Sequence, residues 1–85
     1  MPEIMRKFGM KFFFYSREHE PIHVHVRNTD GKAKFRILPQ VELMECIGIK
    51  QKDIKMAKQI LEMEKEYVIQ QWNNHFGIDV RYDYY

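Results

Sequence analysis

The stretch from Phe12 to Arg27 constrains the fold more than any other part of the chain. An aromatic run leads through a polar loop into two histidines that alternate with two valines. Side chains at positions i and i+2 of a strand point to the same face. The alternation therefore predicts a strand in which His23 and His25 stand side by side, with both valines on the other face.

The length and composition predict one small domain. A chain of 85 residues can bury one modest core, and 45% hydrophobic with 31% charged residues is ordinary for a globular protein. The single cysteine, Cys46, cannot form an internal disulfide, which favours a reducing compartment. The sequence shows neither a signal-peptide pattern nor an apolar run of the roughly 20 residues that span a bilayer. We therefore expect a cytoplasmic protein.

Short alternating segments are followed by one long helical pattern, which predicts an α+β fold. We expect a small antiparallel sheet of about four strands with one long C-terminal helix packed on it. Gly9-Met10 is predicted to make the first tight connection and Asp30-Gly31 a hairpin turn. The segment from Val41 to Cys46 fits either a further short strand or a helical turn. The predicted strands are 4–8, 11–16, 22–28 and 33–38.

The helical pattern runs from about residue 51 to residue 76 and carries two apolar stripes. The first stripe is predicted to pack on the sheet and consists of Ile54, Ala57, Leu61, Val68 and Trp72. The second consists of Met56, Ile60, Met63 and Tyr67 and is a candidate partner interface, although helix ends and the tail could cover it instead. We expect the domain to cover residues 1–77, with 78–85 as a tail that could add an edge strand or cross to a second subunit.

The net charge of +2 is unevenly distributed. Residues 1–39 carry eight Lys/Arg and four Asp/Glu, whereas residues 40–85 carry six and eight. A basic half built on strands could contact phosphates, and the alternative is that these residues are merely the solvated faces of strands. The candidate nucleic-acid-binding residues are Arg6, Lys11, Arg27 and Lys34.

The histidines allow three interpretations. A metal-independent ribonuclease or phosphoesterase needs a general base, a general acid and a cation, which His23, His25, His19 and Arg17 could supply. His19, His23 and His25 could instead bind a metal ion, although no cysteine pair accompanies them. Each histidine could also simply tie a loop through hydrogen bonds to carbonyl groups. The sequence predicts no bound cofactor.

Several motifs in order resemble a family of small bacterial proteins known as domain of unknown function 4160. The matching positions are Pro2, 12–16, His19, Pro21, 23–26, Asp30-Gly31, 33–35, 41–43, Trp72-Asn73 and Phe76-Gly77. The family often has a second proline where this chain has Ile22. The resemblance implies a small stand-alone protein, encoded beside a partner in arrangements typical of toxin–antitoxin pairs, and no established activity. We therefore expect a cytoplasmic binding module, a toxin–antitoxin-like component that associates with a partner protein or itself and with nucleic acid.

Overall fold

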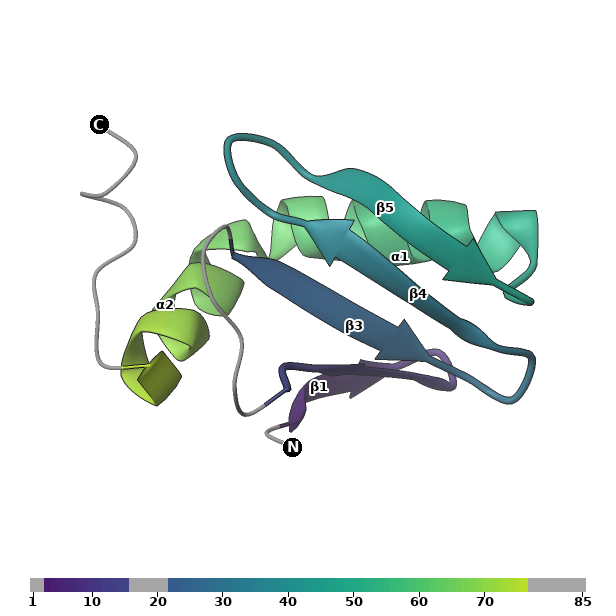
Figure 1. Cartoon of the computed structure of the whole chain (residues 1–85), viewed down its shortest axis with the longest axis horizontal. Coiled ribbons are helices and arrows are strands. Elements are labelled where there is room, and N and C mark those ends of the chain that lie inside the picture. Colours follow the sequence, from purple (N-terminus) through teal and green to yellow (C-terminus); the bar gives the residue numbers. More distant parts are fainter. Residues whose placement is uncertain (1–2, 16–21, 77–85) are drawn as a thin grey trace.

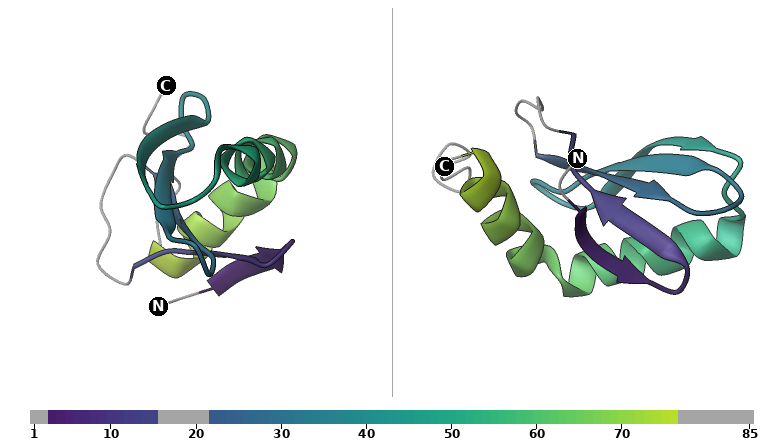
Figure 2. Two further views of the ribbon diagram at one scale, coloured as in Figure 1. Left: turned by 90° about the vertical axis from the view of Figure 1, so that its right-hand side faces the viewer. Right: turned by 90° about the horizontal axis from the view of Figure 1, so that it is seen from below.

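A computed structural model describes residues 3–15 and 22–76 of the chain. Five antiparallel strands form one sheet in the order β1-β2-β3-β4-β5, and two helices cover one of its faces (Figures 1 and 2). The predicted α+β class is confirmed, but the predicted sheet of about four strands and the single long helix each fall one element short, since the described residues form five strands and two helices. The elements are β1 Glu3–Lys7, β2 Met10–Phe13, β3 His23–Arg27, β4 Lys32–Arg36, β5 Glu42–Ile47, α1 Gln51–Met63 and α2 Lys65–Phe76.

The fifth strand, β5, resolves the ambiguous segment of the sequence in favour of a strand. It pairs with β4, and the register shifts between Lys34 and Phe35. Glu45 lies opposite Lys34, whereas Glu42 lies opposite Arg36. A bulge that adds one residue reverses, beyond it, the alternation of side chains between the two faces. Glu42 and Glu45 therefore lie on the same face of the sheet. Without the bulge, two residues three positions apart would lie on opposite faces.

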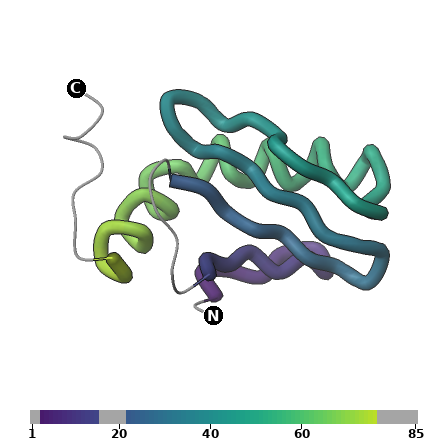
Figure 3. The backbone as a smooth tube through the Cα atoms, in the orientation of Figure 1, coloured from purple at the N-terminus to yellow at the C-terminus, as the bar shows by residue number. Residues whose placement is uncertain are grey.

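The helical segment is interrupted at Glu64, which separates α1 from α2, and the chain bends there (Figure 3). No glycine or proline lies near this break. Two tertiary hydrogen bonds flank it: Lys65 Nζ donates to the carbonyl of Pro39 at 2.9 Å, and Tyr67 Oη donates to the carbonyl of Ile4 at 3.0 Å. The bend allows both helices to pack on the same face of the sheet. The two hydrogen bonds to Pro39 and Ile4, which are distant in the sequence, lie at this bend.

The core lies between the sheet and the helices. Trp72 is 1% exposed and contacts Phe14 edge-on, with 5.2 Å between ring centroids. The first predicted stripe is confirmed, because Ile54 packs against the core and the rest of the stripe is buried. The sheet contributes alternate residues of its strands, namely Phe12, Val24, Val26, Ala33 and Phe35.

The two hairpin turns differ in how well their residues suit them. In the β3–β4 turn, Asn28 Oδ1 accepts hydrogen bonds from the backbone amides of Asp30 and Gly31, a local stabilisation typical of asparagine in turns. The β1–β2 turn is formed by Phe8 and Gly9, with φ of +53° and +76°, so the predicted turn at Gly9-Met10 is one residue late. Positive φ at both central residues favours Asn-Gly, and a bulky residue there costs about 1–2 kcal/mol.

No helix in the described part of the chain is long and apolar enough to cross a membrane. The predicted tail, 78–85, lies outside the described residues.

Candidate nucleic-acid interface

The sheet face turned away from the helices, here called the open face, faces the viewer in Figure 1. Strand register shows which side chains share it, because residues directly opposite each other on neighbouring strands point to the same side. Arg27 pairs with Lys11 on one side and with Lys32 on the other. All four predicted nucleic-acid-binding residues lie on this face, together with His23 and His25. The cations of the open face are Arg6, Lys11, Arg27, Lys32, Lys34 and Arg36.

Four of these cations form one straight row across the sheet. The pairs Arg6–Lys11, Lys11–Arg27 and Arg27–Lys32 are each directly opposite, one residue from each of β1 to β4. With strands spaced about 4.8 Å apart, this cation row is about 14 Å long. Like charges directly opposite each other destabilise a sheet. The positive charge of the cation row therefore lowers the stability of the sheet.

One carboxylate lies at the β1 end of the cation row. Glu3 forms an ion pair with Arg6 at 2.8 Å and lies 3.9 Å from Lys11 Nζ. The hydrogen bond from Arg6 lowers the pKa of the Glu3 carboxyl, and the same bond raises the pKa of Arg6. Within the described part of the chain, Arg27 and Lys32 form no ion pair. The β3–β4 end of the row thus carries the less compensated charge.

Aromatic rings lie next to the cation row. Phe13 is 2% exposed although it belongs to the open face, because the Lys11 ammonium and the Arg27 guanidinium lie 5.9 and 5.7 Å from its ring centroid. His25 stacks on the same ring at 5.6 Å. Tyr15 contacts His25 at 4.2 Å between centroids and is 37% exposed. Tyr15 is therefore the exposed ring of this cluster, whereas His25 beside it is half-buried.

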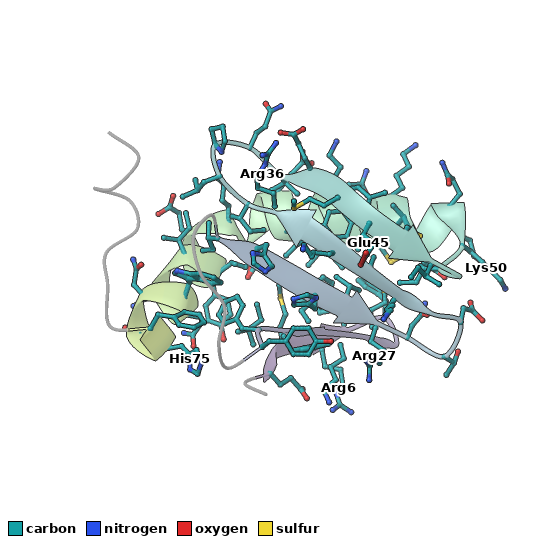
Figure 4. All side chains as sticks on the ribbon, in the orientation of Figure 1. Arg6, Arg27, Arg36, Glu45, Lys50 and His75 are labelled. Carbon is teal, nitrogen blue, oxygen red and sulfur yellow. The ribbon has the colours of Figure 1, made fainter. Side chains whose placement is uncertain are left out.

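The open face is hollowed between these rings and the cations. A pocket of about 160 Å³ is lined by two rings, Tyr15 and His25, and by two cations, Arg27 and Lys32. Lys34 and Glu45, which lie opposite each other on β4 and β5, complete its polar rim. Figure 4 shows Arg27 and Glu45 on this face and Arg36 at the far end of β4, where Arg36 is paired with Glu42 at 2.7 Å. The pocket thus joins positive charge to an aromatic surface.

His23 and His25 lie side by side, as the alternation predicts, with 5.4 Å between ring centroids. Arg36 lies opposite His23 and Lys34 opposite His25. This geometry places two groups that can exchange protons next to cations, the elements of general acid–base chemistry on a phosphate. The other two predicted catalytic residues, His19 and Arg17, lie outside the described residues.

Metal binding depends on the same histidines. Residues 3–15 and 22–76 contain no group of three or more His, Cys, Asp or Glu side chains that could hold a metal ion. His19, the third histidine of this prediction, lies outside the described residues. A metal site using His19 stays a prediction.

The predicted partner interface lies on the helices and is partly buried. Ile60 is 7% exposed and Met56 half-buried, whereas Met63 is 81% and Tyr67 40% exposed. Sequence reasoning missed Lys32 in the cation row. The signal that could have found it is the alternation from Lys32 through Lys34 to Arg36, read together with the hairpin that places this strand beside β3.

The family described as domain of unknown function (DUF4160) matches residues 9–73 of the chain. This match contains β2 to β5 and most of α2, and with them the histidine pair and three of the four residues in the cation row. No curated protein and no solved structure matches the chain.

Proposed function

We propose a function for a chain that belongs to the family described as domain of unknown function (DUF4160), a description that names no activity. The proposed function is binding of single-stranded nucleic acid on the open face of the sheet. The cation row holds the phosphates, and the pocket beside Tyr15 and His25 takes a base. We place this activity in the cytoplasm, as the single cysteine suggests.

The cation row is the observation that carries the proposal. The like-charge pairs Lys11–Arg27 and Arg27–Lys32 each lie in a position where an oppositely charged partner would stabilise the sheet by about 0.2–1 kcal/mol. Binding of a polyanion makes the electrostatic energy of the cation row favourable, because each phosphate attracts the cations and releases counterions. A row of four such residues suits a chain of phosphates better than a single anion.

The aromatic surface favours a single strand over a duplex. Bases stack on exposed rings only when they are not already paired and stacked in a helix. Tyr15 is exposed beside the row and lines, together with His25, a pocket of about 160 Å³. Such a combination of a positive track and a stacking ring is typical of proteins that bind single strands with little sequence preference.

The proposal also includes association through the helices with a protein partner or a second copy of the chain, and the family resemblance adds a role as one component of a toxin–antitoxin-like pair. The exposed Met63 and Tyr67 support a protein contact on the helices, away from the open face. Nucleic-acid binding and protein association would then use separate surfaces, and each can be tested without the other.

The direct test is fluorescence anisotropy with a labelled single-stranded RNA and a labelled single-stranded DNA. The variant Arg27→Gln with Lys32→Gln removes half of the charges of the cation row, and it leaves Lys11 and a glutamine side chain at position 27 beside Phe13. The control Lys52→Gln with Lys55→Gln removes the same charge from exposed positions on α1. We expect the first variant to bind at least about a hundredfold more weakly, since it removes two charged contacts that contribute about 1.5–3 kcal/mol each, and the control to bind like wild type. Equal losses in both variants would contradict a specific site.

The histidine pair supports a second candidate function, metal-independent cleavage of phosphodiester bonds. The observation that favours it is the 5.4 Å separation of His23 and His25 beside Lys34, which could stabilise charge on a phosphate. The variant His23→Gln with His25→Gln is expected to abolish cleavage of labelled RNA, whereas His75→Gln on the exposed side of α2 is not. If wild-type protein binds RNA without cleaving it, the pair serves binding alone.

A further inference from the structure

A second surface lies on the other side of the molecule, between the β1–β2 turn and α1 (Figure 2). It is a groove of about 380 Å³, here called the Phe8 groove. Its apolar lining comes from α1 and consists of Met56, Ile60 and Met63, of which Ile60 is buried and Met63 is exposed. The turn forms one wall with Phe8, and the charged residues Lys7 and Glu64 line it as well. The groove shares no residue with the open face.

Phe8 lies at the rim of this groove with a backbone conformation that is unfavourable for a bulky side chain. Its backbone has a φ of +53° and its side chain is 73% exposed. Asparagine fits this turn position better and would expose no apolar ring. A residue that is unfavourable both in its backbone and in its exposure points to a ligand for the ring.

Lys7 and Glu64 give the lining of the groove one charge of each sign. The hydrogen bond between Tyr67 and the carbonyl of Ile4 places the start of β1 beside the start of α2. Strand β1 then runs toward the Phe8 turn, so Lys7 lies near the turn while Glu64 lies near the junction of the helices. A two-fold axis across the groove would bring Lys7 of each copy to Glu64 of the other.

We propose that the chain forms a two-fold symmetric dimer through the Phe8 groove. Phe8 of each copy inserts between Met56, Ile60 and Met63 of the other, and two Lys7–Glu64 ion pairs flank the contact. A two-fold interface must complement itself, and this surface offers a projecting ring, an apolar hollow and charges of both signs. The dimer leaves both open faces free for nucleic acid.

The first test is sedimentation velocity of the full chain over a concentration series. Wild type is expected to sediment as a dimer, and Phe8→Asn as a monomer that stays folded because asparagine suits the turn. Met44→Asn, which removes an apolar residue 49% exposed on β5, is the matched control and is expected to remain dimeric. A monomeric wild type would overturn the proposal and leave the groove to another protein. A dimeric Phe8→Asn variant would overturn it as well.

The second test uses the charges and does not depend on Phe8. Lys7→Glu and Glu64→Lys are each expected to be monomeric alone, because each places like charges at both flanking contacts. When the two variants are mixed, one flanking contact carries the reversed pair and the other the native pair, so a mixed dimer is expected. Such recovery requires contact between chains. If the mixture stays monomeric while wild type is dimeric, the two-fold arrangement is wrong.

Discussion

The open face and the Phe8 groove both present groups that destabilise the isolated fold, but their chemistry is opposite. On the open face, cations from four neighbouring strands stand directly opposite one another. In the groove, Phe8 has a positive φ and is largely exposed. Elsewhere the same sheet follows the usual rules, as the apolar face beneath the helices and the well-suited Asn28 turn show. The exceptions are therefore localised.

The difference indicates two ligands of different character. Repulsion between fixed cations is relieved by a polyanion and weakened by salt. Exposure of an aromatic ring is relieved by burial against apolar side chains, and salt acts on that surface only through the two flanking Lys7–Glu64 pairs. Changes in one surface should therefore leave the other intact, and the predictions below test that separation, beginning with the largest effect.

The largest effect should come from a residue that supports both surfaces. Trp72 is 1% exposed in the core, and Trp72→Ala is expected to destabilise the chain by about 3–5 kcal/mol. For a small domain this loss is comparable to the whole stability. Both association and nucleic-acid binding should therefore disappear together, as circular dichroism and anisotropy on the same sample would show. Loss of one without the other would mean that the two surfaces do not share one core.

Tyr15→Ala should weaken only the nucleic-acid interaction. Stacking of a base on an aromatic ring contributes about 1–3 kcal/mol, so the expected loss of affinity is about tenfold to a hundredfold. Tyr15→Phe keeps the ring and is expected to bind within a few-fold of wild type. Anisotropy measures the affinity, and sedimentation checks that the oligomeric state is unchanged. Equal effects of both substitutions would show that the hydroxyl matters and the ring does not.

Phe8→Asn should increase the stability of the folded monomer. Relief of the unfavourable backbone conformation is expected to add about 1 kcal/mol, measured by urea denaturation at a protein concentration too low for association. The control Phe8→Leu also removes the ring but keeps a residue unsuited to positive φ, so it should show no gain. A destabilised Phe8→Asn variant would mean that Phe8 already supports the isolated fold.

The smallest effect is expected from Glu3, which neutralises part of the cation row. Glu3→Gln should tighten nucleic-acid binding by a few-fold, because Arg6 and Lys11 lose a competing carboxylate. Since the pKa of Glu3 is lowered in the folded chain, its ion pair is present at neutral pH and is lost only as the pH falls through that lowered value. The difference between wild type and Glu3→Gln should therefore vanish on acidification. Glu62→Gln on α1 is the control and should match wild type at every pH.

The sequence predicted correctly the features of strands, turns and helices that depend only on residues close together in the chain. Alternation placed His23 and His25 on one face, and Asp30-Gly31 marked the hairpin that brings Lys34 opposite His25. The helical period found the stripe that packs on the sheet. In each case the physical cause lies within a few residues of the pattern.

Features that depend on contacts between distant segments were not predicted. The bulge in β5 follows from pairing with β4, and it moves Glu42 to the face that carries Glu45. The break at Glu64 accompanies hydrogen bonds to Pro39 and Ile4, which lie far away in the sequence.

The cation row needs the register of four strands at once. A turn placed one residue late, at Gly9-Met10, would have taken Arg6 out of line with Lys11. Three of the four members could therefore be named as candidates, but not the row itself.

The measurement that tests the central claim most directly is the salt dependence of single-strand binding. For single strands, the logarithm of the association constant falls with the logarithm of salt concentration by about 0.7 for each phosphate neutralised. A fully occupied row of four cations predicts a slope of about −3, and Arg27→Gln with Lys32→Gln predicts about half of it. A slope that these substitutions leave unchanged, or binding that ignores salt, would contradict the assignment of the open face.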